Sequence, residues 1–327
     1  MKNRLLLMVA TGIVLIILPF IFSNPYYLKI LITFGIFAIF ALSLNFIVGY
    51  IGEISFGHAA FLGLGAYFTS LMIYYFNISY WLSLIIALVL TGIVGAFIGM
   101  LSLRLQGVHF AIITLAFAEV FRLIILNLSE VTRGAMGLSV SAPNIPFTQI
   151  SLSNSVLFYY LVFLVLVGVI SLNKLLMSTP YGKAIIAVRE SNHLASSIGI
   201  NVGKYKIITF TISSVIAALA GALYAPYVGI ITPELLSVHY TTEGLLMVIV
   251  GGKGFLFGPL IGAFIFTIIP EFFWMSPEMQ LVVFGIILVL SILYMPKGIA
   301  FLIQKVSDKY LKLNVSLSKS RNRNEEV

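Results

Sequence analysis

Four ionisable side chains in this chain of 327 residues stand in or beside apolar stretches: Glu53, His58, Glu119 and Arg122. An ionised side chain at the centre of a bilayer costs about 2.5 to 3.5 kcal/mol on insertion scales, so such groups usually face protein or water. Carboxylates and imidazoles in such places can carry protons or ions, and they also form pairs that hold helices together. Each of the four therefore calls for a partner or a wet path.

Glu119 and Arg122 lie three residues apart in one apolar stretch. Residues at this spacing share one face of a helix, so we expect the carboxylate and the guanidinium to form an ion pair. The pair is either a structural element of a helix bundle or the border of a transport path or moving interface. The sequence leaves both interpretations open.

Glu53 and His58 fall with Ser55 in a Gly-rich stretch that runs from Gly49 to Tyr67. Hydrogen bonding between helices and lining of a path are the two interpretations of these side chains. One histidine with these neighbours does not form a metal site, because no second ligand stands at metal spacing. Cysteine is absent, which excludes disulfides and thiolate chemistry. We predict no metal in this chain.

The composition indicates that membrane-spanning segments position these ionisable side chains. Hydrophobic residues make up 60% of the chain and charged residues 9%, and the mean hydropathy is +1.10, whereas soluble domains carry about 25% charged residues. We therefore expect an integral membrane protein. The net charge of +8 comes from basic residues beside apolar runs, where they set orientation, so nucleic-acid binding is not expected.

Apolar runs long enough to span a bilayer recur along the whole chain. The predicted fold is an all-α, polytopic bundle that forms one transmembrane domain over residues 1–327. It has eight full spans plus a Gly-broken or re-entrant helix pair, which gives eight to ten membrane helices. The predicted spans are 5–22, 28–51, 54–76, 81–103, 110–128, 156–177, 207–231 and 280–303.

Basic residues predict the orientation of the chain. Of the 19 Lys and Arg residues, 15 fall in the N-terminus, near Arg104, in 174–206, or from Lys297 onward. The positive-inside tendency places these segments in the cytoplasm. Both termini, a loop at 178–206 and a basic tail at 304–327 are thus predicted to be cytoplasmic.

With this orientation, the segment 232–279 must leave and return on the same side of the membrane. Its sequence has an apolar arm, a Gly-rich middle around Gly251–Gly254, and a second apolar arm. Two short helices or a re-entrant hairpin would fit. Irregular backbone at membrane depth is tolerated only where it is buried in protein or lines a wet cavity, so a transport path is expected here.

The stretch from Gly49 to Tyr67 is similar to residues 251–264, since both contain Gly, Phe-Gly and a later Gly-Ala-aromatic group. Interrupted segments in corresponding halves indicate a pseudo-symmetric transporter. Small residues that only allow close helix packing are the alternative.

Catalytic signatures are missing from the sequence. There is no G-x-x-x-x-G-K-[ST] loop to cradle phosphates. No nucleophile, base and orienting group form a recognisable trio. We therefore expect a chain that is not an enzyme and has no ATP-binding motif of its own.

The loop at 178–206 has the punctuation of a helix. Thr179 can cap it, Pro180 suits its first position, and Gly199 suits the left-handed residue after its last turn. At about 100° per residue, most apolar residues of 180–199 fall on one stripe. Ile185 and Ile186 project away from this stripe, which predicts a surface that docks a partner.

Motifs in this order resemble those of the inner-membrane permeases of ABC importers. They are G-x-x-G-x-x-S-x-G-H-A-A-F from Gly49, T-L-A-F-A-E at 114–119, G-K-A-x-x-A-x-R-E-x-N in the loop, and G-G-x-G…G-P at 251–259. The set is most similar to the branched-chain amino-acid permease family of the LivM type, and it covers about residues 40–270.

The resemblance implies four kinds of partner besides membrane lipid: a second related permease, two cytoplasmic ATPases that hold ATP and Mg, and an extracytoplasmic substrate-binding protein. It implies no cofactor in this chain and a location in a prokaryotic plasma membrane. The loop would carry the coupling helix, although Asn192 to Ala195 depart from the family's acidic-and-alanine pattern. The residues expected to couple to the ATPases are Tyr181, Gly182, Lys183, Ile185, Ile186, Arg189, Glu190 and Gly199. The candidate path or gating residues are Glu53, Ser55, His58, Thr114, Glu119, Arg122, Gly252, Gly254 and Gly258.

The leading functional hypothesis is the membrane subunit of an ATP-driven importer for leucine, isoleucine and valine. A related ABC permease for a sugar, urea or an amide is the first alternative. An ion-coupled secondary transporter that uses Glu53, Glu119 and Arg122 is the alternative from another class.

Overall fold

A computed structural model describes residues 18–19, 24–140, 143–144, 152–273, 276–295 and 298–305. Within this part of the chain, seven helices are long and apolar enough to cross a membrane. They are Pro25–Ile51, Ala59–Phe76, Tyr80–Ser102, Val108–Asn127, Ser155–Ser178, Val202–Val228 and Val282–Lys305.

Each of these seven helices overlaps one of the predicted spans, which confirms an all-α polytopic bundle. The remaining predicted span, 5–22, lies outside the described residues except for positions 18 and 19, so the total of eight stays a prediction. The tail beyond residue 305 also lies outside them.

Within the described residues, the elements follow one another as short and long helices with a single pair of very short strands. The first half contains α2 (Pro25–Asn45), the π-helix η1 (Phe46–Ile51), α3 (Ala59–Phe76), α4 (Tyr80–Ser102), α5 (Val108–Asn127), α6 (Ser129–Thr132), η2 (Gly134–Met136) and β1 (Leu138–Ser139). The second half contains α7 (Ser155–Ser178), α8 (Pro180–Glu190), α9 (Asn192–Ser197), α10 (Val202–Val228), β2 (Ile230–Ile231), η3 (Pro233–Leu236), α11 (Val238–Gly251), α12 (Gly258–Phe272) and α13 (Pro277–Tyr294).

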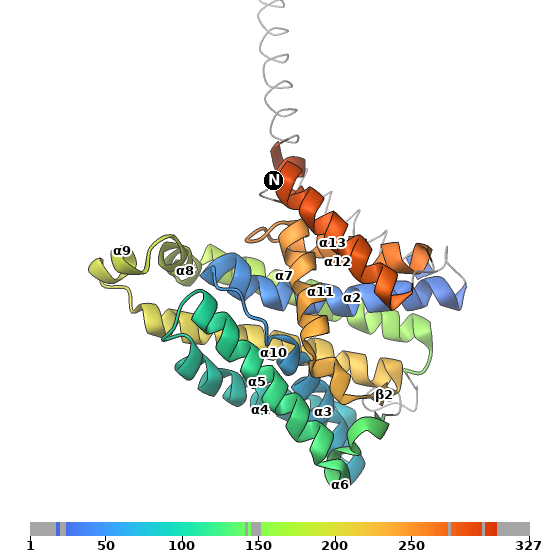
Figure 1. The fold of residues 1–327 in the computed structure, drawn as a ribbon. Coiled ribbons are helices and arrows are strands. Elements are labelled where there is room, and N and C mark those ends of the chain that lie inside the picture. Colours follow the sequence, from blue (N-terminus) through green and yellow to red (C-terminus); the bar gives the residue numbers. More distant parts are fainter. Residues whose placement is uncertain are drawn as a thin grey trace, which may run out of the picture.

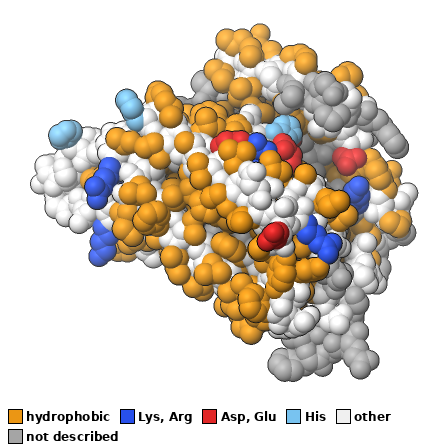
Figure 2. Space-filling model, turned by 60° about the horizontal axis from the view of Figure 1, so that its bottom comes forward, with side chains coloured by type: hydrophobic (Ala, Val, Ile, Leu, Met, Phe, Trp, Pro, Cys, Tyr) orange, Lys and Arg blue, Asp and Glu red, His pale blue; other side chains and the backbone are white. Residues whose placement is uncertain are grey.

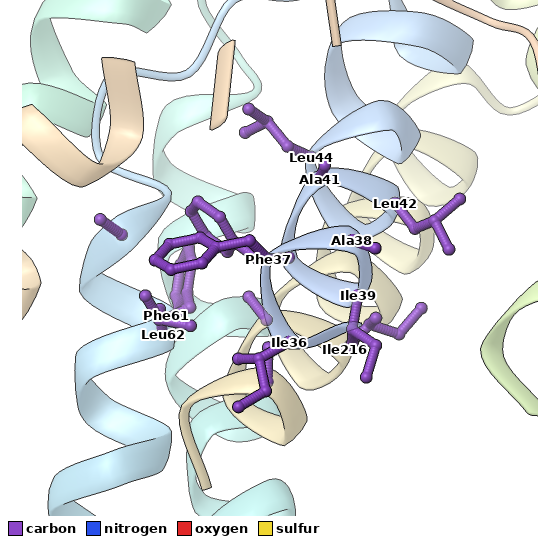
Figure 3. Close-up of a cluster of buried hydrophobic side chains, with 14 of the residues drawn as sticks. Ile36, Phe37, Ala38, Ile39, Ala41, Leu42, Leu44, Phe61, Leu62 and Ile216 are labelled. Carbon is purple, nitrogen blue, oxygen red and sulfur yellow. The ribbon is translucent and has the colours of Figure 1, made fainter. Parts of the chain in front are cut away.

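The core lies where α2, α3 and α10 pack together. Figure 3 shows side chains of α2, among them Ile36 and Phe37, gathered with Phe61 of α3 and Ile216 of α10. Glycines allow close approach, because a Cβ at Gly221 of α10 would collide with the backbone of α3. Small residues at helix interfaces are the usual means of tight packing in membranes.

The outer helices present apolar side chains to their surroundings. In Figure 2, hydrophobic side chains cover most of the visible face and charged ones are few. Long runs of α4 and α13 expose Leu, Val and Ile, for example Ile93 and Leu293. A surface of this kind is suited to lipid or to another membrane subunit.

The bundle has two distinct ends. The helices α8 and α9 lie at one end, and β2 lies at the other (Figure 1). We call these the loop end and the hairpin end, the second after the antiparallel pair of β1 and β2, which lie far apart in the sequence. At the hairpin end β1 and β2 pair antiparallel, with Leu138 opposite Ile231, so a two-residue ladder departs from the all-α expectation.

The segment between α10 and α13 forms two short helices, as one of the two predicted arrangements requires. The helices α11 and α12 have 14 and 15 residues, which at 1.5 Å per residue is about 21 to 23 Å. Neither is long enough to cross a hydrocarbon core of about 30 Å alone. Irregular backbone at 252–257 joins them.

Candidate functional site

Two stretches of irregular backbone meet at the loop end. One runs from Gly52, a left-handed residue with φ of +86°, to the start of α3, and the other joins α11 to α12. The side chain of Asn45, the residue before η1, holds the second stretch, because its Oδ1 accepts from the Gly254 amide at 2.8 Å and its Nδ2 donates to the Phe255 carbonyl at 3.1 Å. Gly49 of η1 lies against the same turn, since a Cβ added to it would be 2.5 Å from the Gly254 nitrogen. The two predicted Gly-rich breaks are therefore neighbours in space.

Arg189, at the end of α8, reaches this junction from the cytoplasmic loop predicted by the charge bias. Its Nη1 donates to the Gly49 carbonyl of the π-helix η1 at 2.6 Å. The same nitrogen lies beside Gly254, because a Cβ added to Gly254 would be 2.9 Å from the Arg189 Nη1. A single guanidinium thus contacts the first break and lies against the second, and π-helical turns are often found at functional sites.

Glu53 is held by charge and by backbone. Its Oε1 lies 3.1 Å from the Lys206 ammonium, and its Oε2 accepts from the Gly107 amide at 2.9 Å. Lys206 is only 3% exposed. The Glu53 carboxylate therefore joins the first break to the beginnings of α10 and α5, and it is paired in the described structure.

His58 lies fully buried between two serines. Its Nε2 is 3.0 Å from Ser43 Oγ and 3.3 Å from Ser213 Oγ. Both hydroxyls already donate to carbonyls, Ser43 to Phe40 and Ser213 to Ser43. Each hydroxyl can then only accept, so in this arrangement Nε2 carries the hydrogen.

Two threonines satisfy the backbone of the first break. Thr114 Oγ1 accepts from the Phe56 amide at 3.1 Å, and Thr241 Oγ1 accepts from the Ala59 amide at 3.0 Å. Ser55 is buried as well, and among the described residues its hydroxyl has no hydrogen-bond partner. The irregular chain is thus supported by side chains from α5 and α11, as burial within a membrane protein requires.

The second Gly-rich break also requires glycine for conformational and steric reasons. Gly252 and Gly254 have positive φ values of +123° and +81°, which favour glycine. A Cβ at Gly258 would collide with the Gly252 carbonyl. These three glycines let α11 and α12 turn back on each other.

Glu119 and Arg122 form the predicted ion pair. The Arg122 Nε donates to Glu119 Oε2 at 2.9 Å, and Nη2 donates to Oε1 at 2.6 Å. The pair is partly exposed and lies about 18 Å along α5 from Gly107 at 1.5 Å per residue. Because Gly107 contacts Glu53, the structure does not bring the pair together with Glu53. His58 bonds to Ser43 and Ser213 and makes no hydrogen bond to the pair within the described residues.

The loop is not one helix over 180–199, which corrects the sequence prediction. Its backbone becomes extended at Ser191, with φ −162° and ψ 117°, so α8 ends at Glu190 and α9 follows. Pro180 does stand at the first helical position, and Gly199 is left-handed with φ of +86°. Thr179 precedes α8, but its hydroxyl donates to the Leu176 carbonyl instead of capping α8.

The break at Ser191 changes which side chains face outward. Ile185 is 1% exposed and belongs to the core, so the prediction that it contacts a partner is wrong. Ile186 is 44% exposed, and Leu194 and Ile198, two members of the predicted apolar stripe, are 70% and 73% exposed. A uniform 100° step per residue fails across a non-helical residue, because the second helix starts at a new angle.

Of the remaining loop residues, two contact neighbouring parts of the protein and two are exposed. The Tyr181 hydroxyl lies 2.9 Å from Thr209 Oγ1 of α10. Gly182 packs against the backbone of Met177, because a Cβ added to Gly182 would be 2.5 Å from the Met177 Cα. Lys183 and Glu190 are exposed.

Several residues of this region escape prediction from the sequence. Lys206 is the last residue of the basic loop. Its pairing with Glu53 could be predicted only by searching the sequence for a cation that balances this carboxylate. Asn45, Ser43, Ser213 and Thr241 lie within apolar runs, and polar side chains inside predicted spans are the one signal that could have marked them.

A polytopic helical bundle in which two broken segments meet and a loop helix reaches their junction has the architecture of a membrane permease. The family described as branched-chain amino acid transport system permease component matches residues 26–292. The chain belongs to this family, and it is a multi-pass membrane protein.

Individual relatives agree with the family. The LivM permease protein of the high-affinity branched-chain amino acid transport system of Escherichia coli K12 is 31% identical over 287 residues, which cover 81% of this chain and 67% of that protein. A probable LivM protein of Methanocaldococcus jannaschii is 28% identical, covering 83% of this chain and 92% of its own. The LivH permease protein of the same E. coli system is 32% identical over 36% of this chain and 39% of its own. No solved structure matches the chain.

Proposed function

We propose that this chain is the membrane subunit of an ATP-driven importer for branched-chain amino acids in a prokaryotic plasma membrane. The observation that carries the proposal is the hydrogen bond from Arg189 of α8 to the Gly49 carbonyl, at the place where the two broken segments meet. Transport systems named for branched-chain amino acids among the relatives support the substrate class.

The proposed partners are a second, related permease, two cytoplasmic ATPases and an extracytoplasmic substrate-binding protein. Relatives named LivM and LivH, two permease proteins of one transport system, support the permease partner. ATP and Mg belong to the ATPases in this proposal, because this chain has no phosphate-cradling loop. Both termini and the 178–206 loop then face the cytoplasm.

The geometry suggests how the ATPases act on the path. When α8 moves with a docked ATPase, the Arg189 guanidinium moves with it and changes its hydrogen bond to the π-helix. Because Asn45 ties η1 to the Gly252–Phe257 turn, both breaks respond together. Two arrangements of these breaks would open the path to one side or the other.

The ATPase would dock on the exposed apolar side chains Ile186, Leu194 and Ile198 of α8 and α9. Apolar anchors on short helices commonly enter grooves on a partner. Ile185 is excluded from this surface because it is buried in the core.

Reconstitution of the whole complex tests the function. Leucine is added to proteoliposomes on the side of the binding protein, and ATP is supplied on the opposite side, where the ATPases lie. The uptake of leucine across the membrane is then measured. We expect ATP-dependent leucine uptake that persists after ionophores collapse the sodium and proton gradients. Uptake that stops with the gradients while ATP remains would instead support an ion-coupled secondary transporter, and transport of a sugar, urea or amide without leucine would support another ABC importer.

A further inference from the structure

A cavity opens near the hairpin end, away from Arg189 and the two breaks. Its volume is about 420 Å³, and its wall comes from α2, α11, α12 and α13. Tyr26, at the end of α2 opposite η1, and Phe37, near the middle of that helix, both line it. Small-molecule pockets usually measure about 300 to 1,000 Å³, so this volume suits a small ligand.

Two carboxylates line the cavity without a permanently charged cation among its described lining residues. Glu271 of α12 accepts a hydrogen bond from the Tyr26 hydroxyl at 2.9 Å, which is a neutral partner. Glu243 of α11 lies 3.4 Å from the imidazole of His239, which is charged only when protonated. Carboxylates removed from bulk water attract a cation more strongly than exposed ones do.

One further polar group in the wall has no partner. Thr267 lies one helical turn before Glu271 on α12 and is 8% exposed, and its hydroxyl makes no hydrogen bond within the described residues. A buried hydroxyl without a partner is unfavourable by about 1 to 3 kcal/mol. A ligand that offers a polar atom to this wall would remove that penalty.

The wall also has an apolar part, beside the polar side chains of Thr33 and Gln280. Phe37, Met247 and Phe266 supply the apolar part of the lining. A ligand that fits both parts has a cationic group and a short aliphatic body. Amino acids with branched side chains have this shape, with an ammonium group as the cation and a carboxylate that can accept from a hydroxyl.

We propose that this cavity is a binding site for the incoming amino acid, in which Glu243 and Glu271 receive its α-ammonium group and Phe37, Met247 and Phe266 contact its side chain. The inference rests on the proposed function and specifies where the substrate first binds in this subunit. Its position at the hairpin end, opposite the coupling helix, is suited to cargo delivered from outside.

Ligands that lack one charged group each test the assignment. The purified complex in nanodiscs, without the binding protein, is titrated calorimetrically at pH 7 with leucine, with isoamylamine, which lacks the carboxylate, and with 4-methylpentanoate, which lacks the ammonium. We expect leucine and isoamylamine to bind and 4-methylpentanoate to bind at least about tenfold more weakly, a difference of about 1.4 kcal/mol.

Charge-neutral variants identify the carboxylates. Glu243→Gln and Glu271→Gln are each expected to weaken leucine binding about tenfold, and Glu243→Asp should bind more tightly than Glu243→Gln. The Glu271→Gln variant keeps an oxygen that can accept from Tyr26, so it tests charge even if Glu243→Gln does not fold. Glu130→Gln removes an exposed carboxylate on α6 and serves as the matched control that leaves binding unchanged.

Four results would overturn the site: no leucine binding to the unaltered complex, equal binding of 4-methylpentanoate and leucine, unchanged leucine binding in both Gln variants, or displacement of isoamylamine by sodium but not by leucine. The last result would indicate an inorganic cation site. ATP-driven leucine uptake by the same preparation separates the two proposals. If the unaltered complex transports leucine while the binding results fail, only the cavity is wrong, and if it transports none, the proposed function itself is wrong.

Discussion

Buried polar groups are arranged differently at the two ends of this bundle. At the loop end Glu53 has Lys206 and the Gly107 amide, and Asn45 bonds to the Gly254 amide and the Phe255 carbonyl of the 252–257 turn. The Ser55 hydroxyl there has no hydrogen-bond partner within the described residues. At the hairpin end the cavity contains two carboxylates with weak or neutral partners and an unpaired Thr267 hydroxyl. The charged and amide groups of the loop end form closed networks that hold a geometry, whereas the carboxylates of the cavity form an incomplete one that leaves a place for a ligand. This contrast suggests transmission at one end and capture at the other.

The comparison first requires that the loop end be a fully packed region. Ile185→Asp places a carboxylate where the side chain is 1% exposed, so we expect a loss of more than about 4 kcal/mol in the free energy of unfolding. Ile186→Asp adds the same charge one position further on, at an exposed site, and is expected to fold normally while it weakens copurification with the ATPases. Thermal unfolding of each variant in detergent measures the difference, and equal midpoints would contradict the assignment of the two faces.

Removal of one partner from the buried ion pair should have the next largest effect. Lys206→Met leaves the Glu53 carboxylate uncompensated and should reduce the free energy of unfolding by about 3 to 5 kcal/mol. Adding Glu53→Gln should restore part of the loss, because the neutral amide oxygen can still accept from Gly107. Lys204→Met, at an exposed position of the same helix, is the control. A midpoint for Lys206→Met that equals the control would show that the pair does not hold the loop end together.

Two substitutions of hydroxyl side chains compare the ends directly. Ser213→Ala removes a donor to the Ser43 carbonyl and an acceptor for His58, and it should cost about 1 to 3 kcal/mol because buried groups lose a partner. Thr267→Val removes a hydroxyl that has no partner in the described structure, so the free energy of unfolding should stay the same or rise. Chemical unfolding of both variants measures this contrast. An equal loss in both would remove the distinction between closed and incomplete networks.

The smallest effect is expected where α8 contacts α10. Thr209 already donates to the Tyr205 carbonyl, so the Tyr181 hydroxyl must donate to Thr209. Burial raises the pKa of Tyr181, which keeps the hydroxyl protonated at neutral and mildly alkaline pH. Tyr181→Phe should therefore cost about 0.5 to 1.5 kcal/mol, with no change in this cost between pH 6 and 9. A loss that disappears at the alkaline end would mean that the hydroxyl ionises.

Local sequence patterns predicted what local physics determines. Apolar runs located seven spans, and the spacing of Glu119 and Arg122 predicted their ion pair. Contacts between distant segments could not be predicted in this way. Glu53 and Lys206 are 153 positions apart, and Asn45 and Gly254 are 209 apart, so only the packing of the whole bundle brings them together.

The 178–206 loop shows why a regular period is not sufficient. The sequence predicted a helix over 180–199 with Ile185 facing outward. Ser191 is a residue type favoured at helix N-caps, and its extended backbone divides the loop while its hydroxyl oxygen accepts from the Leu194 amide at the start of α9. Ile185 packs into the core with Val188, and Ile186, Leu194 and Ile198 become the exposed set.

Coupling between Arg189 and the broken segments is the central claim, and the ratio of leucine uptake to ATP hydrolysis in proteoliposomes tests it most directly. Arg189→Gln removes the charged donor to the Gly49 carbonyl, and a charged hydrogen bond contributes about 1.5 to 3 kcal/mol. We predict that the variant still copurifies with the ATPases and hydrolyses ATP, with uptake per ATP lowered about tenfold or more, while Lys204→Gln behaves as the unaltered protein. An Arg189→Gln complex that transports leucine with an unchanged ratio would contradict the account.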